Sequence, residues 1–137
     1  MEAVFLRSPA VRDPDRLVAI FSHNPKEYGI PYSANSYPDY VDFRDHNEVF
    51  SGIIVFCARP VPMDTGEQTE LIDTEVVSGN YFSELGVKAA VGRTFLPDED
   101  SSLGLHPVTV LSYGFWQHRF GSDPNIVGKT PILNRYP

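Results

Sequence analysis

Proline and glycine divide this chain into short apolar stretches, and that division limits what it can form. The 137 residues include 12 prolines and 10 glycines. Short apolar runs between turn-forming residues favour many short elements over a few long helices. With 42% hydrophobic residues the chain has material for a core, and its length fits one domain. We expect an α+β fold with short mixed or antiparallel strands and two or three short helices.

Five regions predict strands. Residues 17–21 lie between a turn signal and the Asn24-Pro25 breaker, and residues 24–35 lack periodicity and predict a loop. Residues 50–58 and 70–77 flank an Asp-Thr-Gly turn, which predicts a hairpin. Residues 107–111 predict another strand. Residues 127–133 predict a last strand, which Pro131 weakens and which has no returning partner in the sequence.

Two details of the hairpin can be predicted from residue type. Pro60 and Pro62 lack an amide donor, so we expect this stretch at an edge or a bulge. Cys57 is the single cysteine and has apolar neighbours. It cannot form an internal disulfide, and we expect a buried structural thiol.

Helix-capping residues predict three helices. Ser36 and Asp39 match a capping box, and this helix should run to about Asn47 with Tyr37, Tyr40, Val41 and Phe43 on its apolar face. Residues 78–86 begin with capping residues and end at a glycine, which predicts a two-turn helix. Ser112 should cap a third helix that ends at Gly121.

Charge and motifs exclude several classes of function. A formal net charge of -7 with scattered basic residues opposes nucleic-acid binding. The sequence has no G-x-x-x-x-G-K-[ST] loop and no G-x-G-x-x-G turn, so we expect no nucleotide or other cofactor. Residues 1–7 do not resemble a signal peptide, and no apolar stretch reaches the length of a membrane span.

Metal and hydrolase chemistry have weak support in the residues. Asp98, Glu99 and Asp100 start an acidic run, but Leu103 and Thr109 occupy the positions where a calcium loop needs glycine and glutamate. The histidines are dispersed and lack zinc-ligand spacing: His23, His46, His106 and His118. No serine lies in a G-x-S-x-G turn. We assign no catalytic, cofactor-binding or metal-binding residue and expect no enzyme activity.

Several segments together resemble a known family. These are residues 76–87 (VVSGNYFSELGV), 92–95 (GRTF), 108–112 (VTVLS) with Phe115, Trp116, Phe120 and Gly121, and 126–129 (IVGK). In order and spacing they resemble the MacB-like periplasmic core domain of ABC transporter permeases. Residues 37–40 (YPDY), Phe43-Arg44 and 49–52 (VFSG) are similar to the large duplicated permeases of acidobacteria. Pro131 departs from the β-branched residue expected there.

The resemblance implies a noncatalytic domain that faces the periplasm and couples movement of membrane helices to export or efflux. It implies a single, partial core domain over residues 1–137, with residues 1–12 following a first transmembrane helix and residues 13–137 in the core. The implied partners are the rest of the permease with its transmembrane helices, an ABC ATPase on a separate chain or domain, and a periplasmic adaptor. The parent protein would lie in the inner membrane.

Two other functions remain open at this point. One is a freestanding extracytoplasmic module that binds a small apolar or peptide ligand. The other is a small hydrolase that uses His106, His118 or Asp98. Saturable ligand binding would support the first, and loss of activity on alanine substitution at these three positions would support the second.

Overall fold

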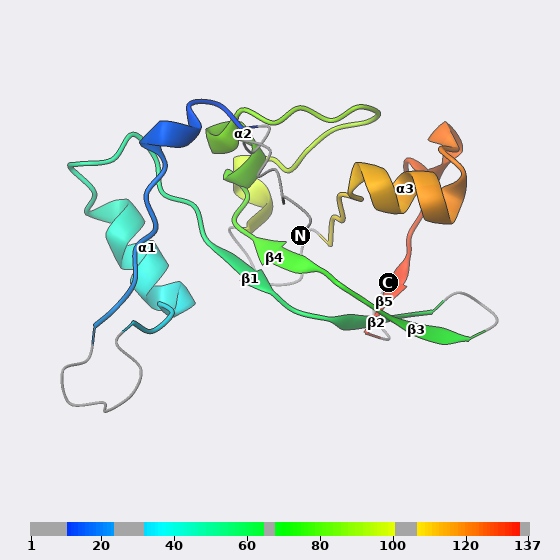
Figure 1. Cartoon of the computed structure of the whole chain (residues 1–137), viewed down its shortest axis with the longest axis horizontal. Coiled ribbons are helices and arrows are strands. Elements are labelled where there is room, and N and C mark those ends of the chain that lie inside the picture. The colour runs from blue at the N-terminus through cyan, green and yellow to red at the C-terminus, as the bar shows by residue number, and fades with distance from the viewer. Residues whose placement is uncertain (1–10, 24–31, 65–67, 101–106, 135–137) are drawn as a thin grey trace, which may run out of the picture.

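The computed structural model describes residues 11–23, 32–64, 68–100 and 107–134, which form helices and two small antiparallel sheets. The helices are α1 (Tyr37–Asp45), α2 (Tyr81–Leu85) and α3 (Tyr113–Phe120), with 3-10 turns at Pro14–Arg16, Pro97–Asp100 and Pro124–Ile126. The strands are β1 (Phe56–Ala58), β2 (Val61–Asp64), β3 (Thr69–Ile72), β4 (Glu75–Val77) and β5 (Ile132–Leu133). The predicted α+β class is confirmed (Figure 1).

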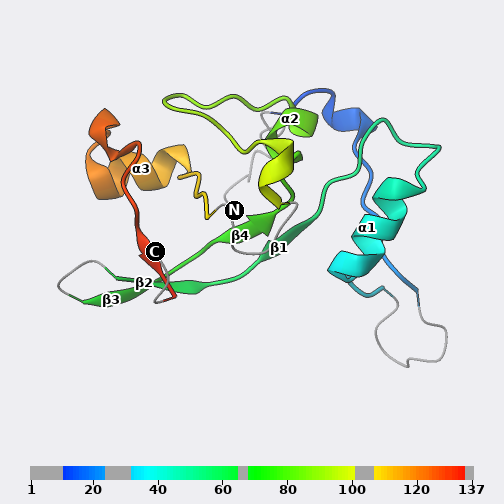
Figure 2. The same cartoon turned by 180° about the vertical axis from the view of Figure 1, so that it is seen from behind.

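Strands β1 to β4 are the two arms of one long hairpin. β1 pairs with β4 and β2 pairs with β3, and both pairs are antiparallel. Ala58 lies opposite Glu75 and Val61 lies opposite Ile72, so the register does not shift between the two ladders. In the gap, the Arg59 amide donates to the Thr74 carbonyl at 2.7 Å. The predicted hairpin is confirmed, and Figure 2 shows its arms crossing the molecule together.

The two prolines of the hairpin point their ring nitrogens away from the opposite arm. In an antiparallel ladder, alternate residues bond to the facing strand. Because Arg59 bonds to Thr74, Pro60 and Pro62 face outward, where the Pro62 carbonyl accepts from the Asn134 amide at 2.7 Å. The predicted edge position is wrong for Pro62, which lies in the middle strand of the β3-β2-β5 sheet. It is tolerated there because its missing donor faces Asn134, just past the end of β5, where the ladder between β2 and β5 stops.

Helices α2 and α3 lie at different ends of the hairpin and contact opposite faces of it. Near α3, Met63 is 8% exposed, and Glu70 of the same face forms an ion pair with Arg119 at 3.2 Å. Near α2, the Phe56 ring packs edge-on against Tyr81. Phe56 and Met63 are an odd number of residues apart along one arm, so their side chains lie on opposite faces.

Helix α1 begins as the sequence predicts. The Ser36 hydroxyl accepts from the Asp39 amide at 3.3 Å, and the Asp39 carboxylate accepts from the Ser36 amide at 2.8 Å. The Ser36 hydroxyl also donates to the Asp39 carboxylate at 2.6 Å, and this bond, together with the bond from the Ser36 amide, favours the charged carboxylate and lowers the pKa of Asp39 below its ordinary value. Of the predicted apolar face only Tyr40 is buried, while Tyr37 and Phe43 are exposed.

Replacing Ser36 by alanine should destabilise the protein by about 1 kcal/mol, because the cap of α1 is lost. The pKa of Asp39 should rise toward its ordinary value, which NMR titration of the carboxyl would measure. Because folding lowers this pKa, the contribution of Asp39 to stability is present above the ordinary pKa and is lost as the pH falls through the folded pKa. Ser51→Ala, at an exposed serine, is the control, and an unchanged Asp39 pKa in Ser36→Ala would contradict the capping box.

The predicted C-terminal caps of the other helices are also confirmed. Gly86 follows α2 with a φ of 69° and Gly121 follows α3 with a φ of 56°, both left-handed conformations that favour glycine. The Ser112 hydroxyl accepts from the Phe115 amide at 3.2 Å and caps α3. Helix α2 differs from the prediction at its start, because it begins at Tyr81 and its N-cap, Asn80, makes no side-chain capping bond.

Three predicted strands are wrong in whole or in part. Residues 17–21 and 107–111 form no strand. The nearest pairing to the first segment is an isolated antiparallel bridge between Ser22, which follows it, and Ser33. The last strand is reduced to β5 because a 3-10 turn and Pro131 precede it. β5 does have a partner, since it pairs antiparallel with β2. Of the predicted loop at 24–35, residues 24–31 lie outside the described residues.

Little of the apolar surface is covered. Among the described residues the buried hydrophobic side chains are Tyr40, Met63 and Leu85. The chain exposes 11578 Å², whereas a compact monomer of this size would expose about 7,100 Å². Large apolar side chains such as Phe21, Phe56, Leu71 and Val76 are more than half exposed. These three residues are therefore the most fully covered hydrophobic side chains within the described part of the chain.

Candidate functional site

The acidic run at residues 98–100 is used for structural contacts. Glu99 forms a bidentate pair with Arg93, at 2.6 and 2.9 Å, and also accepts from the Leu96 amide. This pair raises the pKa of Arg93. Asp100 accepts from the Gly79 amide at 2.8 Å. Residues 101–106 of the suggested calcium loop lie outside the described residues, and no group of three or more metal-ligating side chains occurs within the described ranges.

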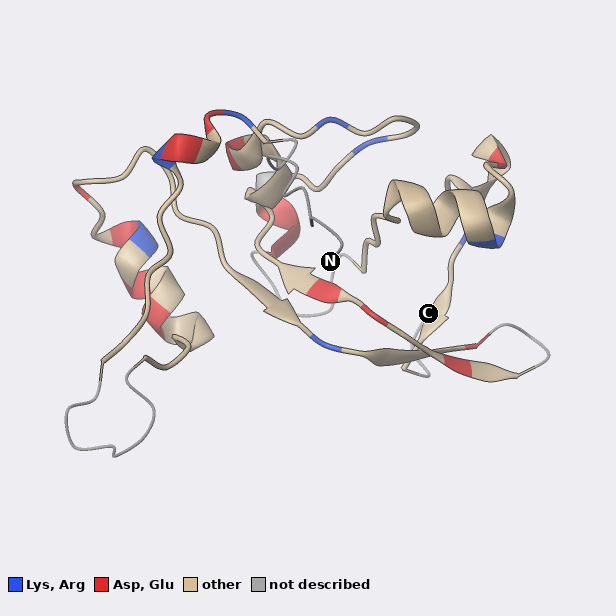
Figure 3. Cartoon of the chain, in the orientation of Figure 1, with Lys and Arg blue, Asp and Glu red and all other residues tan. Residues whose placement is uncertain are grey.

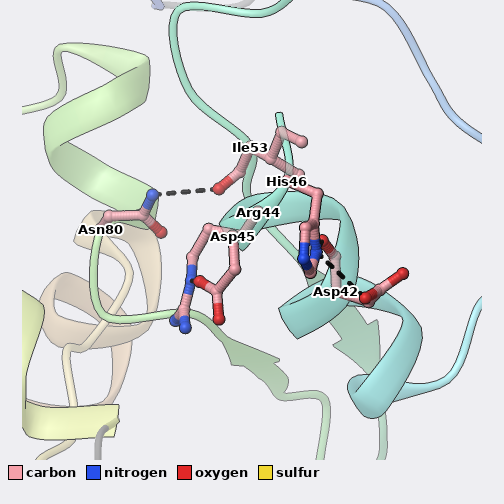
Figure 4. A network of polar contacts seen from close by, with 6 residues as sticks. All are labelled: Asp42, Arg44, Asp45, His46, Ile53 and Asn80. Carbon is pink, nitrogen blue, oxygen red and sulfur yellow. Dashed lines mark hydrogen bonds and ion pairs between the residues drawn. The ribbon is translucent and has the colours of Figure 1, made fainter. Parts of the chain in front are cut away.

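The histidines are placed on separate elements. His46 follows α1, where its Nδ1 lies 3.0 Å from the Asp42 carbonyl oxygen and 3.1 Å from the Asp42 carboxylate, with both side chains exposed (Figure 4). His118 lies in the last turn of α3, and His23 lies beyond residues 17–21. His106 falls outside the described residues. The contacts described for these side chains place no serine or cysteine beside an imidazole.

Cys57 is exposed, so the prediction of a buried thiol is wrong. Its side chain lies on the opposite face of the hairpin from Phe56, which packs against Tyr81 of α2. Opposite Cys57, Val76 is 62% exposed. Cys57 would be buried only if another helix or strand packed over this face of the hairpin, and apolar neighbours in the sequence do not provide one.

The most constrained polar arrangement joins the end of the hairpin to α2. Ser78 is 1% exposed, and its amide donates to the Val55 carbonyl at 3.0 Å while its hydroxyl accepts from the Val55 amide at 3.2 Å. The Asn80 side chain donates to the Ile53 carbonyl at 3.0 Å, as Figure 4 shows. These bonds continue the hairpin beyond β1 and β4. The Ser78 hydroxyl is the acceptor and the Asn80 side chain is the donor at positions where a regular strand would use backbone groups.

Further contacts attach other parts of the chain to α2. The Arg12 amide donates to the Leu85 carbonyl at 2.8 Å. The Phe82 ring contacts Tyr81 and Phe95, with centroid distances of 5.3 and 5.4 Å. We call this set of contacts around Ser78 and α2 the α2 junction. Sequence patterns predicted the helix, but they did not reveal that Ser78 is a buried connector, because its partner Val55 is 23 residues away.

A groove lies beside α1. It has a volume of about 340 Å³ and is lined largely by apolar side chains, among them Ile20, Phe43, Val49, Phe50 and Ile53. Asp42, His46 and Glu48 lie at its polar side. The groove could hold a small apolar group, and among the described residues its lining includes no serine, threonine, cysteine or lysine.

Comparison with family models, with curated proteins and with solved structures finds no match for this chain. Within the described ranges, no helix has both the length and the apolar character needed to cross a membrane.

Proposed function

We propose that this chain is part of the extracytoplasmic core domain of a MacB-type ABC transporter permease. In this role it is noncatalytic and couples the movement of membrane helices to export or efflux outside the membrane. Its partners are the rest of the permease, an ABC ATPase on a separate chain or domain, and a periplasmic adaptor. The parent protein lies in the inner membrane with this segment facing the periplasm.

One observation carries the proposal: the segments that resemble the family coincide with the contacts that connect the fold. Residues 76–87 contain the end of β4, the buried Ser78, α2 and its Gly86 cap. Residues 92–95 end in Phe95, which packs on Phe82. Residues 112–121 contain the complete α3 with both of its caps. A family pattern concentrated on connecting residues supports a mechanical role over a chemical one.

The exposed thiol provides a direct test of which side of the membrane this segment faces. The full open reading frame that encodes these residues would be expressed with Cys57 as its only cysteine. A membrane-impermeant maleimide added to intact spheroplasts should label Cys57, because the thiol is exposed in the fold. The labelled protein should remain in the membrane fraction, and Cys57→Ser should abolish the labelling.

Two other results would contradict the proposal. Labelling only after lysis would refute an extracytoplasmic location. Recovery of the protein in the soluble fraction that is released when the spheroplasts are prepared would favour the freestanding ligand-binding module instead. For that module the groove beside α1 is the supporting observation.

A further inference from the structure

One face of the hairpin is open at the end that carries α3. By strand alternation, Pro62 and Leu71 point away from the face that carries Met63 and Glu70. Ile132 of β5 lies beside Asp64 and shares this orientation. Leu71 is 71% exposed and Ile132 is 43% exposed. We call this surface the open face; its residues are Pro62, Asp64, Thr69, Leu71, Asp73, Glu75 and Ile132.

The open face is hollowed as well as apolar. Pro62, Asp64, Thr69 and Ile132 line a depression of about 550 Å³ on it. All four of these residues belong to the same face by register, so the depression lies on the sheet surface and not at its edge. A depression of this size can accept one or two apolar side chains of a partner.

Charge on the open face has one sign. Asp73 and Glu75 are exposed, and Asp64 adds a third carboxylate beside the depression. The only basic residue of the hairpin, residues 56–77, is Arg59. Arg59 lies opposite Thr74 and belongs to the other face. Figure 3 shows acidic positions recurring along the arm that contains β3 and β4, and one more at the end of β2. Among the described residues of the open face the charged side chains are all carboxylates, and exposed apolar side chains lie between them, so this face is complementary to a segment that combines apolar and basic side chains.

We propose that the open face binds an extended segment of a partner protein in which apolar residues alternate with lysine or arginine. The apolar side chains cover Leu71 and Ile132 and enter the depression, while the basic side chains pair with Asp73 and Glu75. This inference stands on the surface of the hairpin and does not depend on the proposed transport function.

Charge also argues against two other occupants. A second copy that docked through the same face would bring its own Asp73 and Glu75 against this pair, and like charges facing each other oppose association. An anionic lipid surface would repel the same carboxylates. The partner segment is therefore the occupant that the charge pattern favours.

Synthetic peptides of 12 residues would test the proposal with the complete 137-residue chain. The probe is a peptide that alternates lysine with valine or leucine, and the comparisons are a peptide with glutamate for lysine and one with serine for the apolar residues. Fluorescence anisotropy in low salt would measure the affinities. The basic apolar peptide should bind, the acidic one should not, and the lysine-serine peptide should bind about tenfold more weakly because it covers no apolar surface.

Variants locate the site. Asp73→Asn with Glu75→Gln should weaken binding of the basic apolar peptide by about tenfold, since each exposed ion pair contributes a few-fold. Leu71→Ser should weaken it by a similar factor, about tenfold, and should leave the circular dichroism spectrum unchanged because Leu71 is exposed. The matched control is Asp42→Asn with Glu48→Gln, which removes the same charge near α1 and should leave the affinity unchanged.

Several results would overturn the proposal. One is the absence of binding by the basic apolar peptide, and another is equal binding of the lysine-serine peptide. An equal loss of affinity in the α1 control would mean that net charge, and not the open face, attracts the peptide. A dimer in analytical ultracentrifugation that Leu71→Ser dissociates would identify a second copy as the occupant.

Discussion

Replacing Leu85 by alanine should lower the free energy of unfolding by about 3 kcal/mol. Leu85 is 7% exposed and lies in the last turn of α2, where its carbonyl also accepts from the Arg12 amide. Among the described residues only Tyr40 and Met63 are comparably buried hydrophobic side chains. A cavity at Leu85 therefore removes a large part of the packing in the α2 junction. Urea denaturation followed by circular dichroism would measure the loss.

Leu71→Ala is the matched control for this prediction. It removes the same atoms from a leucine that is 71% exposed, so the free energy of unfolding should change by less than about 0.5 kcal/mol. Equal losses in the two variants would show that α2 is not a centre of stability in this chain.

Replacing Gly86 by alanine should cost about 2 kcal/mol, from two causes. The residue has a φ of 69°, a conformation that costs an L-residue about 1 kcal/mol or more. A Cβ at this position would also lie 2.9 Å from Cβ of Arg12, so the segment that Arg12 attaches to α2 would have to move. The loss should appear in the same urea measurement as for Leu85.

Substitutions at two other glycines distinguish the cost of the left-handed backbone conformation from the cost of the contact with Arg12. Gly121→Ala places a side chain at a φ of 56° with nothing within 4 Å, so it should cost about 1 kcal/mol from the backbone alone. Gly114→Ala lies inside α3 in open space and should stabilise the protein by about 1 kcal/mol. If Gly86→Ala cost no more than Gly121→Ala, the contact with Arg12 would contribute nothing.

The elements that the sequence predicts correctly are those with local causes. The capping box at Ser36, the cap at Ser112 and the terminal glycines at 86 and 121 involve partners within a few residues. The hairpin register also follows from the small number of residues that separate its two arms in the sequence. In each case the residues that determine the local geometry are close together in the sequence, so the sequence pattern is sufficient to predict it.

The incorrect predictions concern features that need a distant partner. Residues 17–21 and 107–111 have the composition of strands, but a strand forms only where another strand offers its backbone. Cys57 has apolar neighbours, yet its burial would require an element packed over that face of β1. Pro62 occupies a middle strand because β5, from the far end of the chain, pairs along its other side.

The same reasoning applies to the candidate sites. Ser78 looked like a helix cap, and only the fold places its hydroxyl against the Val55 amide and Asp100 against the Gly79 amide. The open face requires both the hairpin register and the position of β5. Its acidic residues, Asp64, Asp73 and Glu75, are not consecutive in the sequence, so composition alone does not distinguish a binding surface from an ordinary solvated one.

The outward-facing prolines have a consequence for how the chain behaves before it meets any partner. An exposed strand edge offers amide donors that can recruit strands of other molecules and start aggregation. At Pro60, which lies outside the stretch that β5 covers, that edge has no hydrogen to donate, while the bonds between the two arms are unaffected because Pro60 occupies a position that does not use them. The hairpin can therefore remain open along one face without its edge becoming a template for uncontrolled polymerisation.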